Sequence, residues 1–225
     1  MVINVDMKKY LVETNYFDFS HPAIQRLSGK IKGASPKEYA VAIYYLVRDS
    51  IRYNPYMVKY GEPSFKASHA AEHGQSYCIP KAGLMVAMCR RFNIPARLGL
   101  ADVRNHLSSD KFIEMIGTDY FAMHGYVEVW LDKQWIKATP VFNKELCEKF
   151  NVEPLAWDGQ SDAIFQEFTR DGNKHMDYLK DHGCFDEVPV SFIMQNFKKH
   201  YPKLFKNGLE AIKGESFELD LKNAD

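Results

Sequence analysis

The segment 75–97 limits what this chain can fold into more than any other part of the sequence. Within it, Cys78 begins a stretch rich in apolar residues, and Asn93 and Pro95 follow that stretch directly. The spacing of the apolar residues predicts a helix over 78–92, which Asn93 can end and Pro95 cannot continue. The sequence therefore predicts a cysteine at the N-terminus of a helix with a buried face.

A second feature, the stretch 121–131, alternates between two sets of side chains. This pattern is typical of a β-strand, because successive side chains of a strand point to opposite faces. One face would carry Gly125, Val127, Val129 and Leu131, and the other His124, Tyr126, Glu128 and Trp130. A tight turn at Asp132-Lys133 then predicts a hairpin with a strand over 134–138.

Cys78 and His124 are residue types that nucleophilic catalysis uses. A thiol at a helix N-terminus feels the positive end of the helix dipole, which lowers its pKa and favours the thiolate. A histidine beside such a thiol can hold the proton and complete a nucleophile–base pair. Either residue alone is more often structural, so the hypothesis depends on the two features occurring together.

The remaining pattern predicts an α+β chain, with helices first, an antiparallel sheet second and helices again. We expect further helices over 23–31, 36–51, 67–73, 144–150, 175–181, 189–200 and 201–213, and a strand over 96–103. Residues 1–19 are rich in β-formers and can begin with a strand, whereas 52–66, 105–119 and 151–173 are expected to be loops. No flexible linker is visible, so we expect one domain over 1–225, with a core at about 36–140 and a C-terminal helical extension at 141–225 packed on it.

The charge balance argues against large charged partners. Lys plus Arg and Asp plus Glu are 29 each in 225 residues, so the formal net charge is zero and broad attraction to nucleic acid or to an anionic membrane is not expected. The sequence shows no secretion signal and no apolar run long enough to span a bilayer. Cys78, Cys89, Cys147 and Cys184 are irregularly spaced. We therefore expect reduced thiols, a cytoplasmic location and no cofactor.

In combination, these motifs resemble the transglutaminase-like superfamily, in particular its bacterial members. The resemblance rests on Cys78 at a helix start, Asn93-Ile-Pro-Ala-Arg97 at the helix exit, the stretch 124–131, and Trp135 to Pro140. It covers residues 36–140 well and the C-terminal third more loosely. It implies a papain-like fold in which the cysteine helix packs against an antiparallel sheet. By position, it also implies Cys78 as the nucleophile and His124 as the general base.

The third residue of the family's site is usually an aspartate just before a proline, and this chain has Thr139 there. An aspartate would orient the imidazole and stabilise its charged form, whereas a threonine can accept a hydrogen bond but brings no charge. Four other residues are also candidates for orienting His124, and the choice stays open: Asn143, Asp102, Asp158 and Asp162.

Acyl transfer also requires hydrogen-bond donors for the oxyanion. The backbone N–H of Cys78 is the natural first donor, and Gln75 or Tyr77 can supply the second. Tyr53 is a further candidate, although core packing is the commoner role of such a tyrosine.

A rival chemistry comes from His69-Ala-Ala-Glu72-His73, which matches the H-x-x-E-H signature of zinc hydrolases. Histidines at i and i+4 face one side of a helix and can hold zinc. However, the match is short, Gly74 ends the predicted helix, and no motif for a third ligand follows. A zinc hydrolase is therefore the minor alternative, and we expect no metal.

The favoured hypothesis is a cysteine enzyme that cleaves or transfers an amide or peptide acyl group through a thioester on Cys78. The expected substrate is a protein, a peptide or a small amide. Hydrolysis is favoured over cross-linking, because nothing in the chain indicates a dedicated amine site or a calcium loop. The other alternative is a catalytically weak or inactive peptide-binding module on the same fold, which Thr139 in the aspartate position suggests.

Overall fold

A four-stranded antiparallel sheet organises the chain in the computed structural model, which describes residues 5–206, 208–209, 212 and 216–220. The strands lie in the order β5 (Gln134–Ala138), β4 (Tyr120–Leu131), β3 (Ala96–Asn105) and β6 (Met176–Phe185). A separate two-stranded sheet pairs β1 (Arg52–Tyr53) in parallel with β2 (Gln75–Ser76).

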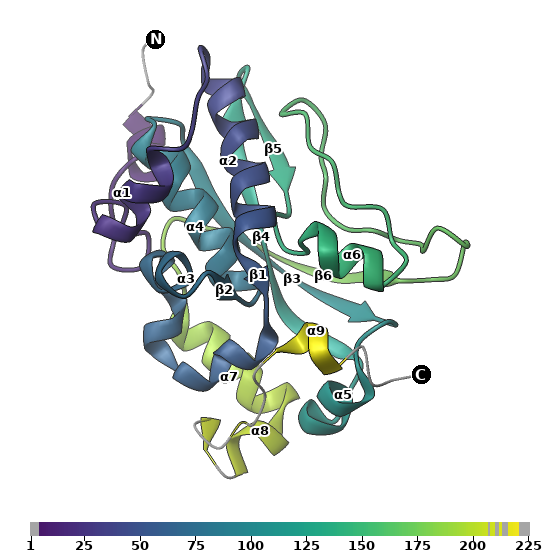
Figure 1. Ribbon diagram of the computed structural model, residues 1–225. Helices are drawn as coiled ribbons and strands as arrows, with labels where there is room; N and C mark the ends of the chain where they lie inside the picture. Colours follow the sequence, from purple (N-terminus) through teal and green to yellow (C-terminus); the bar gives the residue numbers. More distant parts are fainter. Residues whose placement is uncertain (1–4, 207, 210–211, 213–215, 221–225) are drawn as a thin grey trace.

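Helices precede, interrupt and follow the sheet. Those before it are η1 (Val5–Tyr10), α1 (Pro22–Ser28), α2 (Pro36–Ser50), η2 (Pro55–Tyr60), η3 (Glu62–Phe65), α3 (Ala67–His73) and α4 (Cys78–Arg91). Those within and after it are α5 (Asp110–Ile116), α6 (Lys144–Lys149), α7 (Val190–His200), α8 (Pro202–Lys206) and α9 (Phe217–Asp220). Figure 1 shows α4 lying against the sheet, with α2 alongside it. This is the expected α+β, papain-like arrangement, with the cysteine helix packed on an antiparallel sheet.

The cysteine helix α4 forms the centre of the core. Every residue from Ile79 to Arg90 is buried, and the helix packs on α2, α3, β3 and β4. Each fully buried leucine or valine on it, such as Leu84 or Val86, stabilises the fold by roughly 1.5–3 kcal/mol relative to an exposed side chain. The position of the first residue of α4 is therefore set by the packing of the whole helix.

Lys81 joins the ends of two of these helices. Its side chain is fully buried, and its Nζ donates to the carbonyl oxygen of Arg48 at 3.0 Å and to that of Ile51. Both carbonyls lie at the C-terminal end of α2, where the helix itself supplies no donor. Burial lowers the pKa of Lys81 to about 7. Lys81 therefore connects α4 to the end of α2 through hydrogen bonds.

Most of the predicted core elements are confirmed. The helices expected over 36–51, 67–73 and 78–92 are α2, α3 and α4, and the expected strands are β3, β4 and β5. These elements were predictable because capping residues, prolines and alternation are local signals.

Four predictions are wrong. The expected loop 52–66 contains the short strand β1 and the 3-10 helices η2 and η3. The expected loop 105–119 contains α5, which Ser109 caps by accepting a hydrogen bond from Phe112 N at 3.3 Å. The expected helix 175–181 is instead the start of β6, so the C-terminal extension is not wholly helical. β6 is an edge strand and is half exposed, so its sequence lacks the clear alternation that would have predicted a strand. The described part of 1–19 begins with the 3-10 helix η1. Of the helix expected over 201–213, α8 is present, and 207, 210–211 and 213 lie outside the described residues.

The C-terminal part of the chain returns to the start of the cysteine helix. α7 packs on β4, and Phe217 of α9 contacts the rings of Tyr53, Tyr56 and Phe112. Residues before α3 and after β6 therefore close over the same end of the core.

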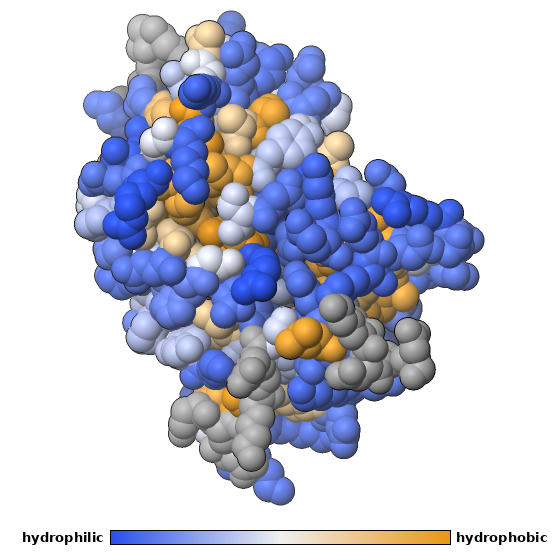
Figure 2. Space-filling view, viewed as in Figure 1, coloured by the Kyte–Doolittle hydropathy of each residue, from blue (hydrophilic) through white to orange (hydrophobic). Residues whose placement is uncertain are grey.

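Polar side chains dominate the face of the molecule shown in Figure 2, and apolar residues show through mainly near α2 and α4. Large apolar side chains that are exposed are scattered: Val12, Tyr60, Phe168, Leu179, Phe192 and Leu219. In the part of the chain that the structure describes, no helix has both the length and the apolar character needed to cross a membrane.

Candidate active site

Cys78 is the first residue of α4, and the short β1–β2 pair fixes the chain that leads to it. The N–H of Arg52 donates to Gly74 O at 2.9 Å, and that of Asn54 donates to Ser76 O at 2.8 Å. Tyr77 follows in an extended conformation and supplies no side-chain cap to the helix. The first N–H groups of α4 are therefore available to the sulfur of Cys78.

Gly125 allows β4 to approach the start of α4 closely. A Cβ at this position would lie 2.9 Å from Ile79 Cα and 3.1 Å from Cys78 O, distances that real Cβ atoms do not tolerate without a shift. The backbone N–H groups of Gly125, Ile79 and Cys78 act on the sulfur and favour a lower pKa of the thiol. The glycine therefore brings a donor from the sheet to the cysteine.

His124 directly precedes Gly125 on β4. Its imidazole is buried, with 6% of the residue exposed, and its ring centroid lies 6.5 Å from that of Phe142. Burial lowers the pKa of His124 to about 4, because the charged ring would lose its hydration. No other described residue forms a hydrogen bond with the ring. The imidazole is therefore neutral at neutral pH and has the capacity to accept a proton.

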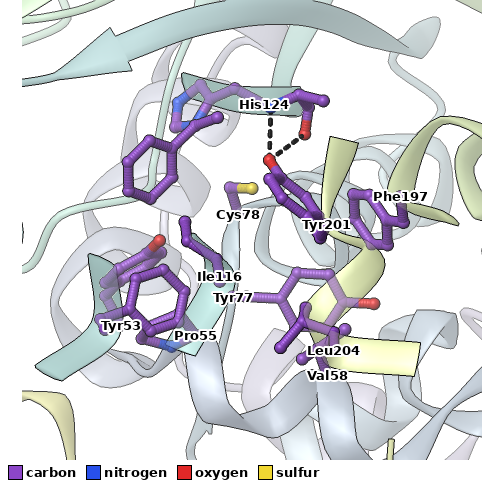
Figure 3. Close-up of a pocket in the computed structure, with 13 residues that line it drawn as sticks. Tyr53, Pro55, Val58, Tyr77, Cys78, Ile116, His124, Phe197, Tyr201 and Leu204 are labelled. Atoms are coloured by element: carbon purple, nitrogen blue, oxygen red, sulfur yellow. Dashed lines mark hydrogen bonds between the residues drawn. The ribbon is translucent and has the colours of Figure 1, made fainter. Parts of the chain in front are cut away.

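Cys78 and His124 line one cavity of about 60 Å³. Figure 3 shows the sulfur among the lining side chains, with His124 on one side of it and Tyr77 and Tyr201 on the other. The remaining lining residues are Tyr53, Pro55, Val58, Phe112, Ile116, Phe121, Ala122, Phe197 and Leu204. The cavity is thus an apolar, largely aromatic space with one thiol and one imidazole in its wall.

The expectation that the helix N-terminus lowers the thiol pKa was wrong for this arrangement. Burial raises the pKa of Cys78 to about 11, and this exceeds the opposite effect of the three backbone N–H groups. The residue keeps some accessible surface because it faces the cavity, yet protein atoms surround the sulfur closely. The thiol and the imidazole are both neutral at neutral pH, and no hydrogen bond between the two is present in the described structure.

Thr139 and Asn143 form no hydrogen bond with the imidazole in the described structure. The Oγ1 of Thr139 is buried and has no hydrogen-bond partner in the part of the chain that the structure covers. Asn143 accepts a hydrogen bond from Tyr53 N at 3.1 Å and donates to Glu145 Oε2 at 2.8 Å. Its side chain therefore connects β1 to α6.

The three aspartates considered as orienting residues are also engaged elsewhere. Asp158 accepts from the N–H groups of Gln160 and Ser161 in an exposed turn, at 2.8 and 3.0 Å. Asp162 accepts from Lys137 N at 2.8 Å. Asp102 is buried in β3, and its Oδ1 accepts from Met123 N on β4; it forms no hydrogen bond with the imidazole in the described structure.

The candidate oxyanion donors differ in their availability. Gln75 Oε1 accepts from Asn54 Nδ2 at 3.0 Å, and the Tyr77 hydroxyl is 3.1 Å from Ser64 Oγ. The Tyr53 side chain lines the cavity with Cys78, and its hydroxyl has no hydrogen-bond partner among the described residues. Among the candidate oxyanion donors in the cavity lining, the Tyr53 hydroxyl is therefore the one that can still donate a hydrogen bond to a ligand.

The H-x-x-E-H segment forms α3, away from the cavity. The rings of His69 and His73 stack with their centroids 4.0 Å apart, and Glu72 lies 3.7 Å from His21 Nε2. Within the described ranges, no group of three or more His, Cys, Asp and Glu side chains is arranged to hold a metal ion.

Sequence reasoning missed the wall of the cavity that comes from the C-terminal helices. Phe197 on α7, Tyr201 after it and Leu204 on α8 all line the space around Cys78. The amphipathic pattern of 190–200 predicts a helix with a buried face, but periodicity carries no information on where that face docks.

A papain-like α+β fold with a cysteine at the start of its central helix defines the class of this protein. The family model of the Transglutaminase-like superfamily matches residues 25–140, and the chain belongs to this superfamily.

A solved structure titled "Putative Cysteine Protease" from Cytophaga hutchinsonii is similar to this chain, with 16% sequence identity and a TM-score of 0.44. The match covers 82% of this chain and 57% of that one, so this chain corresponds to little more than half of its length. No curated protein matches the chain.

Proposed function

We propose that this protein is a cysteine acyl-transfer enzyme in which Cys78 is the nucleophile and His124 the general base. The observation that carries the proposal is the shared cavity. The thiol and the imidazole line it together, and three backbone N–H groups act on the sulfur. Membership of the transglutaminase-like superfamily supports the same assignment.

The resting pair is neutral, so the proton has to move when the substrate is bound. The Cys78 sulfur attacks the amide carbonyl carbon while the thiol proton passes to the imidazole of His124. The C–N bond then breaks, the imidazolium gives its proton to the leaving amine, and a thioester remains. Water attacks the thioester, loses a proton to His124, and releases the acid as the C–S bond breaks and the thiol is restored. An amine in place of water would give a new amide.

The Tyr53 hydroxyl is a suitable donor to the oxyanion of this reaction. It faces the cavity with no described partner, and an oxyanion donor is most effective when it is already in place. This assigns to Tyr53 a role that sequence analysis ranked below core packing.

The cavity favours an apolar acyl group. Its lining contains no Asp, Glu, Lys or Arg, and a charged group would lose its hydration there without gaining a partner. We therefore expect the substrate to present an uncharged, apolar group beside the scissile carbonyl, within a protein, a peptide or a small amide. We propose hydrolysis over transfer to an amine, because the cavity lining carries no carboxylate that would bind the ammonium form of an amine.

Acylation by p-nitrophenyl butyrate at pH 8 tests the proposal. This apolar ester is expected to release p-nitrophenol and to leave a butyryl group on the peptide that contains Cys78, as measured by mass spectrometry. Cys78→Ala should abolish both signals, and His124→Asn should slow acylation at least a hundredfold. Cys184→Ser is the matched control, since Cys184 is the other half-exposed thiol and lies outside the cavity. Acylation that persists in Cys78→Ala would contradict the proposal.

A second candidate is a non-catalytic peptide-binding module on the same fold. Two observations favour it: Thr139 occupies the family's aspartate position, and burial holds the thiol in its neutral form. An apolar amide that binds to the protein but is never acylated onto Cys78 would support this candidate over the enzyme.

A further inference from the structure

The strand that carries His124 is interrupted by a bulge just before this residue. Ala101 pairs with His124 and Val103 pairs with Phe121, so β4 has an extra residue opposite Asp102. A bulge of this kind redirects the side chain next to it. The geometry of the bulge therefore determines where the imidazole lies.

Met123 is the strained residue of this bulge. Its φ of 62° lies in the left-handed region, which few residues other than glycine adopt, and the residue is fully buried. Such a conformation persists only where the surroundings hold it. Its backbone N–H donates to Oδ1 of Asp102 at 3.0 Å. The carboxylate of Asp102 thus holds the residue that directly precedes His124.

Asp102 is itself held firmly from two other directions. It is 2% exposed, and its Oδ2 accepts from the Tyr120 hydroxyl at 2.6 Å and lies 2.8 Å from His182 Nε2. Burial alone would raise the pKa of Asp102, but the contacts with Tyr120, Met123 and His182 outweigh it and lower the pKa. The acceptor that faces Met123 is therefore a fixed carboxylate.

The other residue of the bulge, Ala122, precedes Met123 and is held from the cavity side. The N–H of Ala122 donates to the Tyr201 hydroxyl at 2.5 Å, and the same hydroxyl donates to Ala122 O at 3.4 Å. These are the two dashed lines in Figure 3, close to His124. The backbone before His124 is thus held by Tyr201 on one side and by Asp102 on the other.

We propose that Asp102 is a positioning residue for His124, acting through the backbone of Met123 and not through the imidazole ring. It is a buried carboxylate that fixes the histidine in a chain whose usual ring-orienting aspartate is replaced by Thr139. The relevance of Asp102 to catalysis rests on the proposed function, whereas its effect on the position of the His124 ring does not.

Two variants and a matched control test this role. Asp102→Leu keeps the branched shape of the side chain but removes the acceptor for Met123, whereas Asp102→Asn keeps both the shape and an acceptor oxygen. Glu128→Gln is the control, because Glu128 is also a buried carboxylate of the same sheet, but it pairs with Arg97 at 2.5 Å and is remote from the bulge. Each protein is labelled with ¹³C-histidine, and the ring signals are titrated by NMR, with His124 assigned from His124→Asn.

In the wild type, Asp102→Asn and Glu128→Gln, His124 is expected to titrate near pH 4. In Asp102→Leu the ring should leave its buried place, and its pKa should rise toward the ordinary value of about 6.5. Acylation of Cys78 by p-nitrophenyl butyrate should then fall about a hundredfold in kcat with little change in KM, because the base is misplaced while the cavity is intact. Loss of thermal stability alone would not move the titration of His124.

The proposal is overturned if His124 titrates identically in the wild type and in folded Asp102→Leu, or if Asp102→Asn shifts it as much as Asp102→Leu. Should Asp102→Leu fail to fold, hydrogen exchange in the wild type decides. The Met123 amide lies outside the strand ladder, so rapid exchange would refute its bond to Asp102, and strong protection would support it. A wild type that titrates as expected but is never acylated would contradict the proposed function and leave the positioning role standing.

Discussion

Replacing Gly125 with alanine probes the contact on which the candidate site depends. The three atoms nearest to the added Cβ would all be backbone atoms: Ile79 Cα at 2.9 Å, Cys78 O at 3.1 Å and Ile79 N at 3.1 Å. Backbone atoms of a packed helix cannot rotate away as the end of a side chain can. The start of α4 and strand β4 therefore have to separate.

The size of the effect follows from these distances. The closest one is about 0.5 Å short of the 3.4 Å at which ordinary contact begins. Overpacking of this kind costs about 1–3 kcal/mol. In a chain of 225 residues, each kcal/mol lowers the melting temperature by about 2–4 °C, so we expect a fall of roughly 2–12 °C.

The separation should also change the chemistry of Cys78. The N–H of Gly125 is one of the three donors that act on the sulfur, and its withdrawal raises the pKa of the thiol further. Acylation by p-nitrophenyl butyrate should therefore slow in Gly125→Ala, even at temperatures where the variant is fully folded.

Gly83→Ala on the same helix is the matched control. A Cβ at Gly83 would meet the Phe17 ring at 3.5 Å, which is ordinary contact, and alanine in a helix is favoured over glycine by about 0.5–1 kcal/mol. Urea unfolding should place the two variants on opposite sides of the wild type. A Gly125→Ala protein as stable and as reactive as the wild type would refute the reasoning.

Three further predictions follow from buried polar groups. His124 and His175 both have pKa values lowered to about 4 by burial, so the unfolded chain binds protons that the folded one does not between pH 6.5 and 4. Urea unfolding should therefore show stability falling over this range, by up to about 3 kcal/mol for each residue, and a flat profile would contradict it. Lys81 has its pKa lowered to about 7, so its contribution to stability should rise with pH from 7 toward 10.5 by as much as about 5 kcal/mol, and Lys81→Met should lose this rise. Thr139→Val should unfold at the same or slightly higher urea concentration and keep acylation unchanged, because the buried hydroxyl has no described partner; a large loss of acylation would instead make Thr139 an orienting residue.

Local sequence signals were sufficient for the elements that carry Cys78 and His124. The helix 78–92 was predictable from its apolar spacing and from Asn93 and Pro95, and β4 was predictable from alternation. These signals depend on neighbours in the chain, so they survive without knowledge of the fold.

The electrostatics of the site were not predictable in the same way. The argument from the helix dipole considered only the local helix, whereas burial dominates the thiol pKa, and the residues that line the cavity around the sulfur come from several distant parts of the chain. The bulge at Met123 likewise depends on Asp102, a residue of another strand. A single sequence contains no local mark of such contacts.

The cavity is lined by residues inside the segment that matches the superfamily model and by residues outside it. Cys78 and His124 lie within the matched residues 25–140, whereas Phe197, Tyr201 and Leu204 come from beyond them. Mutations in this distal stretch can reshape what the pocket admits while every group in the matched segment stays unaltered. Under the proposed function, selectivity and reactivity can thus evolve separately, and swapping the distal stretch between relatives is a direct way to exchange one without the other.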